Sequence, residues 1–145
     1  MEKWWTIVIY CETTERVYFY KLNLKQILIW GGKMVIILGI LMYFVGAICK
    51  YLHDDYKQYP NIHVGYKMGT AMKDKETWEE ANNYIYKACT MFLIFAISFV
   101  GLTNLMNLKL PSAVYCISEI LIIVGPIVLT EIHSYRFNKN KDVNN

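Results

Sequence analysis

The sequence predicts an all-α membrane protein with three transmembrane helices, an amphipathic helix leading into the second span and a short N-terminal appendage. The 145 residues are 55% apolar, and the apolar residues gather in three long blocks that hold few charges. A helix needs about 20 residues to cross a hydrocarbon core of about 30 Å, and each block approaches that length. A soluble domain would instead spread its apolar residues at helical or strand spacing.

The N-terminal appendage, residues 1–25, has the least regular pattern. Two β-branched and aromatic runs, 4–11 and 17–22, flank a polar stretch at 12–16. This pattern favours a short interfacial β-hairpin. An isolated hairpin is marginal in water, so the membrane surface or the bundle would have to cover it. The first run is too short for a cleavable signal peptide and lacks a small-residue cleavage site.

The three-span domain is predicted over residues 26–134, with spans at about 34–52, 88–106 and 110–130. Lys33 and Lys50 bracket the first span and can extend their ammonium groups into the headgroup layers. The third span contains Glu119 near its midpoint and Pro126 towards its end, where a kink is expected. Because only residues 109–111 join the last two spans, these spans must form an antiparallel pair.

The C-terminal segment and the charge distribution set the expected orientation. Residues 135–145 form a polar tail, of which 138–145 is expected to be disordered. Nine Lys and Arg residues lie on the side of the second loop and the C-terminus, against six on the other side. The positive-inside rule therefore predicts that this loop and the C-terminus are cytoplasmic in a bacterial cell membrane.

Several function classes find no support in the sequence. The net charge of +3 is spread over several loops, so no nucleic-acid partner is expected. The four cysteines have no close spacing, which argues against a disulfide framework or a zinc site, and we expect no cofactor. The segment 53–63 has histidines and aspartates in no common metal-binding pattern. Nucleophile, phosphate-loop and zinc-hydrolase motifs are missing from the sequence, so we predict that the chain is not an enzyme.

The segment between the first two spans carries the strongest functional signal. The residue before Pro60 is driven to an extended conformation, and Gly65 and Gly69 mark positions where a positive φ is needed. Asp74 offers a helix N-cap, and Thr77 with a glutamate three residues later offers a capping box. A helix is therefore predicted to begin near residue 75.

One face of this predicted helix continues into the second span. It consists of Trp78, Ala81, Asn82, Ile85 and Cys89, which recur at helical spacing. We expect this face to lie against the bundle, with the Trp78 ring packed and the Asn82 amide hydrogen-bonded to a loop backbone.

The segment resembles the signature of the SdpI family, small bacterial membrane proteins named after an immunity protein against a secreted sporulation-delaying toxin. The matching elements, in order, are Pro60-Asn61, Gly65-Tyr66, Met72-Lys73-Asp74, Glu76-Thr77-Trp78 and Ala81-Asn82, followed by a span. The likeness covers about residues 34–133. It departs at Lys67-Met68, where the family usually has Arg-Thr, and lysine does not replace a planar bidentate donor.

The resemblance implies an integral membrane immunity protein that protects the producing bacterium against a membrane-active peptide toxin or bacteriocin. It also implies a signalling role through a sequestered cytoplasmic regulator. A structural or accessory subunit of a transporter or envelope complex is the alternative. The motif residues either latch the loop onto the bundle or contact the toxin or another partner. The candidates are Asn61, Gly65, Tyr66, Lys67, Trp78, Ala81 and Asn82.

Polar residues of the third span give a second set of candidates. A carboxylate at mid-depth is costly, so Glu119 is expected either to face the bundle interior or a wet cavity, or to be protonated. In the protonated form it would bond to Ser98, Asn104 or Ser118 across the helices. Glu131 and His133 are expected to mark the exit of the third span into water.

Overall fold

The computed structural model describes residues 24–108 and 110–144, and within them the chain is helical without strands. The long helices are α1 (Leu24–Tyr51), α2 (Lys75–Leu105) and α3 (Ser112–Asn144), and the short 3₁₀ helices are η1 (Tyr56–Gln58) and η2 (Gly69–Met72). All three long helices are long and apolar enough to cross a membrane, which confirms the predicted fold class. The predicted hairpin runs, 4–11 and 17–22, lie outside the described residues.

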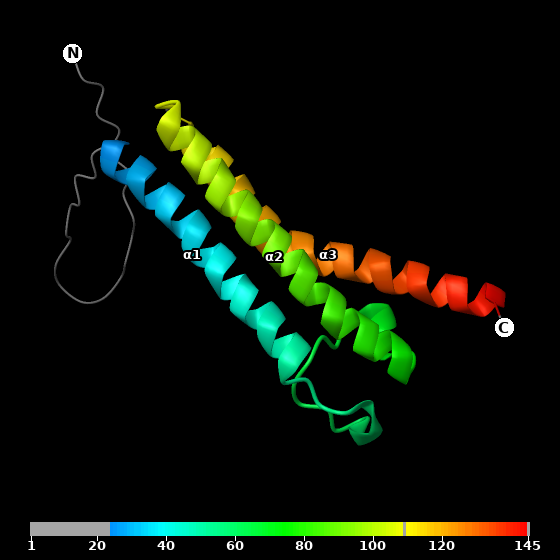
Figure 1. Cartoon of the computed structure of the whole chain (residues 1–145). Coiled ribbons are helices and arrows are strands. Elements are labelled where there is room, and N and C mark those ends of the chain that lie inside the picture. Colours follow the sequence, from blue (N-terminus) through cyan, green and yellow to red (C-terminus); the bar gives the residue numbers. More distant parts are fainter. Residues whose placement is uncertain (1–23, 109, 145) are drawn as a thin grey trace, which may run out of the picture.

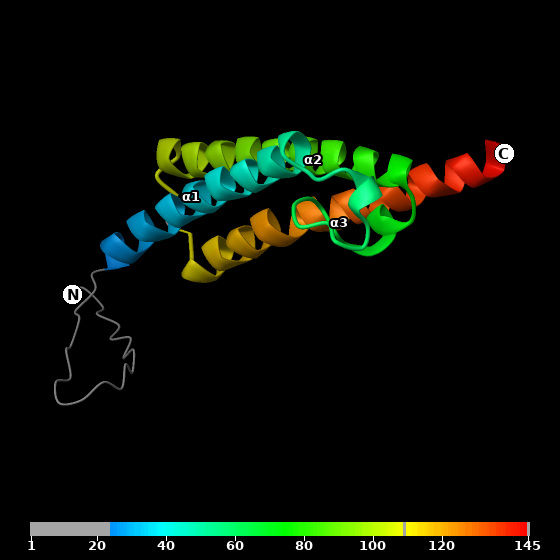
Figure 2. The same ribbon diagram turned by 90° about the horizontal axis from the view of Figure 1, so that it is seen from below.

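The helices form a three-membered bundle in which each contacts the other two. Figure 1 shows α1 and α3 running in the same general direction, with α2 antiparallel between them in sequence. The loop between α1 and α2 and the C-terminus therefore lie at one end of the bundle, and the α2–α3 turn lies at the other (Figures 1 and 2). This arrangement places the loop between α1 and α2 and the C-terminus on the same side, as predicted.

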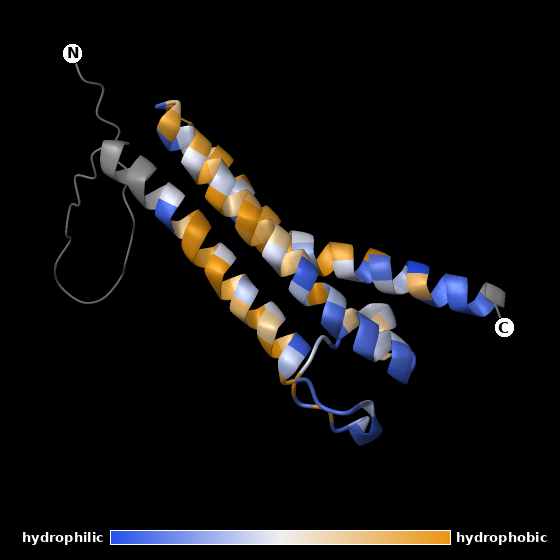
Figure 3. Cartoon of the chain, in the orientation of Figure 1, coloured by the Kyte–Doolittle hydropathy of each residue, from blue (hydrophilic) through white to orange (hydrophobic). Residues whose placement is uncertain are grey.

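All three long helices are longer than a membrane requires, and α2 and α3 exceed that length the most. At 1.5 Å per residue, α2 and α3 measure about 46 and 50 Å, against a hydrocarbon core of about 30 Å. Their surplus turns project beyond the end of α1, and Figure 3 shows that these projecting turns and the loop are mainly hydrophilic, whereas the other coloured parts of the helices are mainly apolar. The predicted amphipathic helix and second span are thus one continuous helix. Pro126 lies inside α3 without ending it.

The prediction of a disordered C-terminal tail is wrong. Residues 135–144 continue α3, although their composition is polar. The physical reason is tertiary, because the polar side chains of this segment pair with the first turn of α2, as described below. Composition alone contains no information about such partners.

Glycine determines how closely α1 approaches α2. Gly32, Gly39 and Gly46 are seven residues apart and face Val100, Ala96 and Cys89 of α2. A Cβ at Gly46 would lie 3.0 Å from Cys89 Cβ and 3.1 Å from the Tyr86 Cα atom. Small residues at matching positions let helix backbones approach in a membrane, where close packing replaces the hydrophobic effect between helices.

Buried side chains gather in two clusters along the bundle. One lies near the α2–α3 turn and consists of Val35, Ala96, Val100, Tyr115 and Ile122. The other lies beneath the loop and consists of Cys49, Tyr66, Ala71, Ala81, Ile85 and Cys89. Outward positions are large and apolar, for example Phe44, Ile94 and Ile120. Such a surface suits lipid rather than water.

Candidate functional site

The residues between α1 and α2 form a structured cap over one end of the bundle. We call residues 52–74 the cap loop; it contains η1 and η2. Figures 1 and 2 show it beside the projecting ends of α2 and α3, and η2 contacts both helices. The candidate motif residues all lie in this loop or in the first two turns of α2.

Trp78 is the centre of contact between the cap loop and α2. Its side chain is 0% exposed, and its indole N–H donates to the Asp54 carbonyl oxygen over 3.1 Å. Gly65 lies directly against the ring, since a Cβ there would be 2.5 Å from Trp78 Cη2. Gly65 also has a φ of +131°, which confirms the predicted positive value. Only glycine satisfies both conditions.

Asn82 joins the same contact through its amide. Its Oδ1 accepts from the Tyr66 backbone N–H over 2.8 Å, and its Nδ2 donates to the Trp78 carbonyl over 2.8 Å. The predicted bond to a loop backbone is therefore present. The predicted inward face is also confirmed, because Trp78, Ala81, Asn82, Ile85 and Cys89 are all buried. We call Gly65, Tyr66, Trp78 and Asn82 the latch.

A second anchor joins the cap loop to α3 through Glu131. The Tyr66 hydroxyl donates to Glu131 Oε1 over 2.9 Å, and the Thr70 backbone N–H lies 3.2 Å from Oε2. Gly69, with the predicted positive φ, leaves room for this carboxylate. Burial and the adjacent Glu131 carboxylate raise the pKa of Tyr66 above its ordinary value. Glu131 is thus a docking residue for the cap loop, a role that the sequence did not predict.

We predict that Tyr66→Phe weakens this anchor without emptying the core. The variant keeps the buried ring and loses one hydrogen bond to a charged acceptor, an interaction worth about 1.5–3 kcal/mol. Thermal unfolding in detergent should show the loss. Tyr59→Phe is the matched control, because Tyr59 lies in the same loop but is exposed. Equal unfolding temperatures of Tyr66→Phe and Tyr59→Phe would show that the Tyr66 hydroxyl contributes nothing to the stability of the protein.

The Asp54 carboxylate closes the cap loop on itself. Its Oδ2 accepts the backbone N–H groups of His63 and Val64 at 2.6 and 2.8 Å. These two bonds hold the pKa of the Asp54 carboxyl below its ordinary value, and the bond from Val64 has the larger effect. Lys67 adds a bond from its Nζ to the carbonyl of Ile62 in the same segment.

We predict that the cap loop loosens in acid because of Asp54. A carboxyl whose folded pKa is lowered stabilises the fold fully above its unfolded pKa, and this contribution disappears as the pH falls through the folded value. Hydrogen exchange at the His63 and Val64 amides, corrected for intrinsic rates, should therefore accelerate below about pH 4, the ordinary aspartate range. Asp54→Asn should show fast exchange already at neutral pH, whereas Asp55→Asn should not. Acid-independent protection in the wild type would refute this role.

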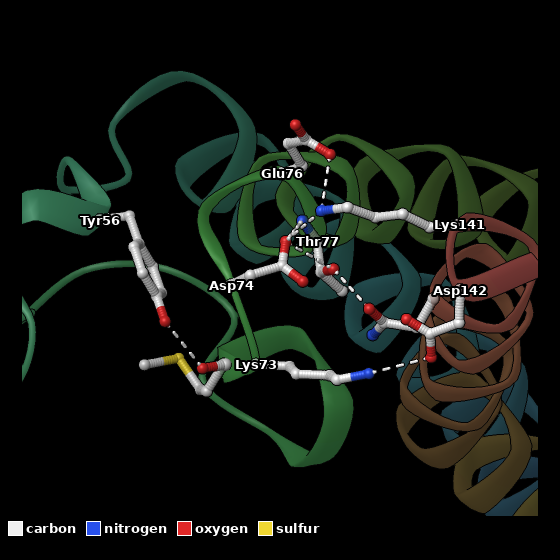
Figure 4. Close-up of polar contacts among 9 residues, drawn as sticks. Tyr56, Lys73, Asp74, Glu76, Thr77, Lys141 and Asp142 are labelled. Atoms are coloured by element: carbon white, nitrogen blue, oxygen red, sulfur yellow. Dashed lines mark hydrogen bonds and ion pairs between the residues drawn. The ribbon is translucent and has the colours of Figure 1, made fainter. Parts of the chain in front are cut away.

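The first turn of α2 is tied to the end of α3 by ion pairs, shown in Figure 4. Lys141 reaches between Asp74 and Glu76, with N–O distances of 3.2 and 2.7 Å. Lys73 pairs with Asp142 at 3.3 Å. Burial alone would raise the pKa of the Asp74 carboxyl, but the Thr77 N–H and Lys141 hold it below its ordinary value. These pairs explain why the polar tail is helical.

Asp74 is the predicted N-cap, and its Oδ1 accepts the Thr77 backbone N–H over 3.0 Å. Thr77 Oγ1 lies 3.0 Å from both Asp74 Oδ1 and Asn138 Oδ1, but one hydroxyl proton serves only one acceptor. With the Asn138 amide turned over, its otherwise unpartnered Nδ2 donates to Thr77, and Thr77 donates to Asp74. That arrangement gives the Thr77 hydroxyl proton a single acceptor and gives Asn138 Nδ2 a partner.

The predicted Thr77–Glu80 capping box is not formed. Glu80 instead lies 2.8 Å from His133 Nε2 on α3. The His133 ring stacks on Tyr84 with centroids 3.8 Å apart and an interplanar angle of 4°. His133 therefore links α2 to α3, and it does not simply mark the exit of α3 into water.

Four predicted site residues lie outside the latch, and one of them, Ala81, packs in the buried cluster that includes Tyr66 and Ala71 of the cap loop. Asn61 and Lys67 are exposed on the cap loop, so they are accessible to a partner. Glu119 is half-buried, two turns into α3. Within the described residues it bonds to none of the expected partners, since Ser118 donates to the Val114 carbonyl and Ser98 and Asn104 are exposed. The described part of the chain contains no group of three or more potential metal ligands.

Asp54, Glu131 and Asn138 are among the contact residues that the sequence reasoning missed. They bond to partners that no sequence spacing specifies.

Three apolar helices with a latched polar cap define a small helical protein of the multi-pass membrane class. Comparison of the chain with protein-family models, with curated proteins and with solved structures finds no match.

Proposed function

We propose that this chain is an integral membrane immunity protein that protects a bacterium against a membrane-active peptide toxin or bacteriocin. The observation that carries the proposal is the latch. Three of the residues that carry the SdpI resemblance, Gly65, Trp78 and Asn82, fix the cap loop on the bundle. A loop with its own buried aromatic and anchors to two helices is built to present a defined surface, whereas a simple connection between spans needs none of these contacts.

The latch also divides the candidate residues by role. Gly65, Tyr66, Trp78, Ala81 and Asn82 hold the loop, so they reach a partner only indirectly. Asn61 and Lys67 are exposed on the same loop. In this proposal they contact the toxin, or a cytoplasmic regulator held at the membrane. The excess of Lys and Arg at this end supports a cytoplasmic location for the cap loop and the C-terminus.

The test is expression in a sensitive bacterial host, followed by challenge with candidate membrane-active peptides. The proposal expects survival with the wild-type chain, and loss of protection at normal membrane levels with Asn61→Ala combined with Lys67→Ala. Lys57→Ala, an exposed change in the same loop, is the matched control. Unchanged killing by every cognate peptide would reject the proposal and favour the accessory-subunit alternative.

A further inference from the structure

The end of the bundle that carries the cap contains cations that form no ion pair among the described residues. Every described Asp and Glu side chain at this end accepts a hydrogen bond or forms an ion pair within the protein. These carboxylates are Asp54, Asp55, Asp74, Glu76, Glu79, Glu80, Glu131 and Asp142. Several cations at the same end have no acidic partner among the described residues: Lys50, Lys57, Lys67, Lys87, Arg136 and Lys139. The ammonium and guanidinium groups of these residues can therefore pair with an external anion.

Lys50 is the most organised of these cations. It lies in the last turn of α1, and its Nζ is 4.8 Å from the centroid of the Tyr51 ring and 4.6 Å from that of Tyr86. The two rings meet edge to face at 5.7 Å. Ring faces attract an ammonium group but carry no net charge to neutralise it. The Lys50 ammonium is thus held in place and still lacks a counter-ion.

Hydroxyl groups lie beside this cation. The Tyr43 and Tyr86 hydroxyls are 3.1 Å apart, and either can be the donor. A pair of hydroxyls uses one proton for the bond between them and keeps the other proton for an outside acceptor. Lys87, which is exposed and next to Tyr86 in sequence, is a second lysine at the same level of α2. An ammonium with an adjacent hydroxyl donor is a suitable environment for a phosphate diester.

The depth of Lys50 indicates where that phosphate comes from. Lys50 follows Lys33 by 17 residues, or about 26 Å of helix, close to the hydrocarbon thickness of about 30 Å. When Lys33 reaches one headgroup layer, Lys50 reaches the other. Val45 and Ile48, just before Lys50 on α1, are exposed and apolar, so they can receive an acyl chain. Hydrogen-bond donors thus lie at the depth of the lipid headgroup, and an apolar surface lies at the depth of the acyl chain.

We propose that the cap-side end of the α1–α2 contact binds the headgroup of an anionic phospholipid, with Lys50 facing the phosphate and the Tyr43–Tyr86 pair donating to it. This site is distinct from the latch and from the exposed loop residues of the proposed immunity function. It can be occupied whichever peptide or partner the cap recognises.

Lipid retention in native mass spectrometry tests the proposal. Full-length protein in mild detergent is offered phosphatidylglycerol and phosphatidylcholine at equal concentration. The wild type should retain phosphatidylglycerol in preference. Lys50→Met keeps the apolar stem without the charge. It should reduce the preference for phosphatidylglycerol roughly fivefold, which is the effect of one lysine near an anionic surface. Tyr43→Phe should lower it less. Lys33→Met, the same change at the other end of α1, should leave it unchanged.

A thermal-unfolding series checks the fold and the source of the phosphate. Lys50→Met should unfold like the wild type without added lipid, and only the wild type should gain full stability from phosphatidylglycerol. Wild-type preference in Lys50→Met, or no preference in the wild type, would overturn the proposal. Equal stabilisation by inorganic phosphate would also overturn it, because the ligand would then be a free anion.

Discussion

Trp78→Ala should release the cap loop from the bundle and lower the amount of protein in the membrane. The change removes a fully buried ring that fills the space beside Gly65 and bonds the Asp54 carbonyl. Loss of such a ring costs roughly 3–5 kcal/mol, a large part of the stability of a small domain. Asn82→Leu should cost about 1–3 kcal/mol, because the Tyr66 N–H is left buried without an acceptor. Limited proteolysis of residues 52–74 and quantitative blotting of membranes measure both effects.

Two further variants make this test specific. Glu79 lies one residue from Trp78 on the exposed side of α2, where its ion pair with Lys75 contributes little to stability. Glu79→Ala should therefore behave as wild type. Gly65→Ala should resemble Trp78→Ala, since its methyl group would meet the indole and its φ is unfavourable for alanine. The steric part of the Gly65→Ala defect should shrink in a Trp78→Leu background. Normal abundance of Trp78→Ala with lost protection would mean that Trp78 serves a partner and not the latch.

Local periodicity explains which parts of the site could be predicted from the sequence. The spacing of Trp78, Asn82 and Cys89 determines one helical face, whatever that face contacts. Asp74 ahead of that helix is a local capping signal, and Gly65 and Gly69 are local backbone signals. Each of these features depends on residues within a few positions of one another, so each was visible in the sequence.

Contacts between distant segments explain what could not be predicted. Glu131 bonds to Tyr66 across 65 positions, and a carboxylate at the end of a span is indistinguishable in sequence from one that faces water. The polar tail is helical because Lys141 pairs with Asp74 and Glu76, partners that its composition does not reveal. Glu80 was available to a capping box but pairs with His133 instead. In each case tertiary structure decided among partners that the sequence allowed equally.

The glycines of α1 provide the second large expected effect. Gly46→Leu should separate α1 from α2, because a Cβ there would lie 3.1 Å from the Tyr86 Cα, a backbone atom that cannot rotate away. Overpacking in a well-packed interior typically costs about 1–3 kcal/mol, and contact with backbone places this case at the upper end. The variant should accumulate less in membranes and unfold at a lower temperature in detergent.

A graded series distinguishes this steric effect from a general effect of adding leucine to a membrane helix. Gly39→Leu should be less harmful than Gly46→Leu, since its nearest neighbours are side-chain atoms of Ala96 and Leu93 at 3.2 and 3.3 Å. Gly32→Leu should be milder again, with its nearest neighbour at 3.5 Å. Gly101→Leu on α2 is the matched control, because nothing lies within 4 Å of a Cβ there. If the unfolding temperatures do not follow this order, and Gly46→Leu unfolds at the same temperature as Gly101→Leu, then α1 and α2 do not depend on glycine for their close approach.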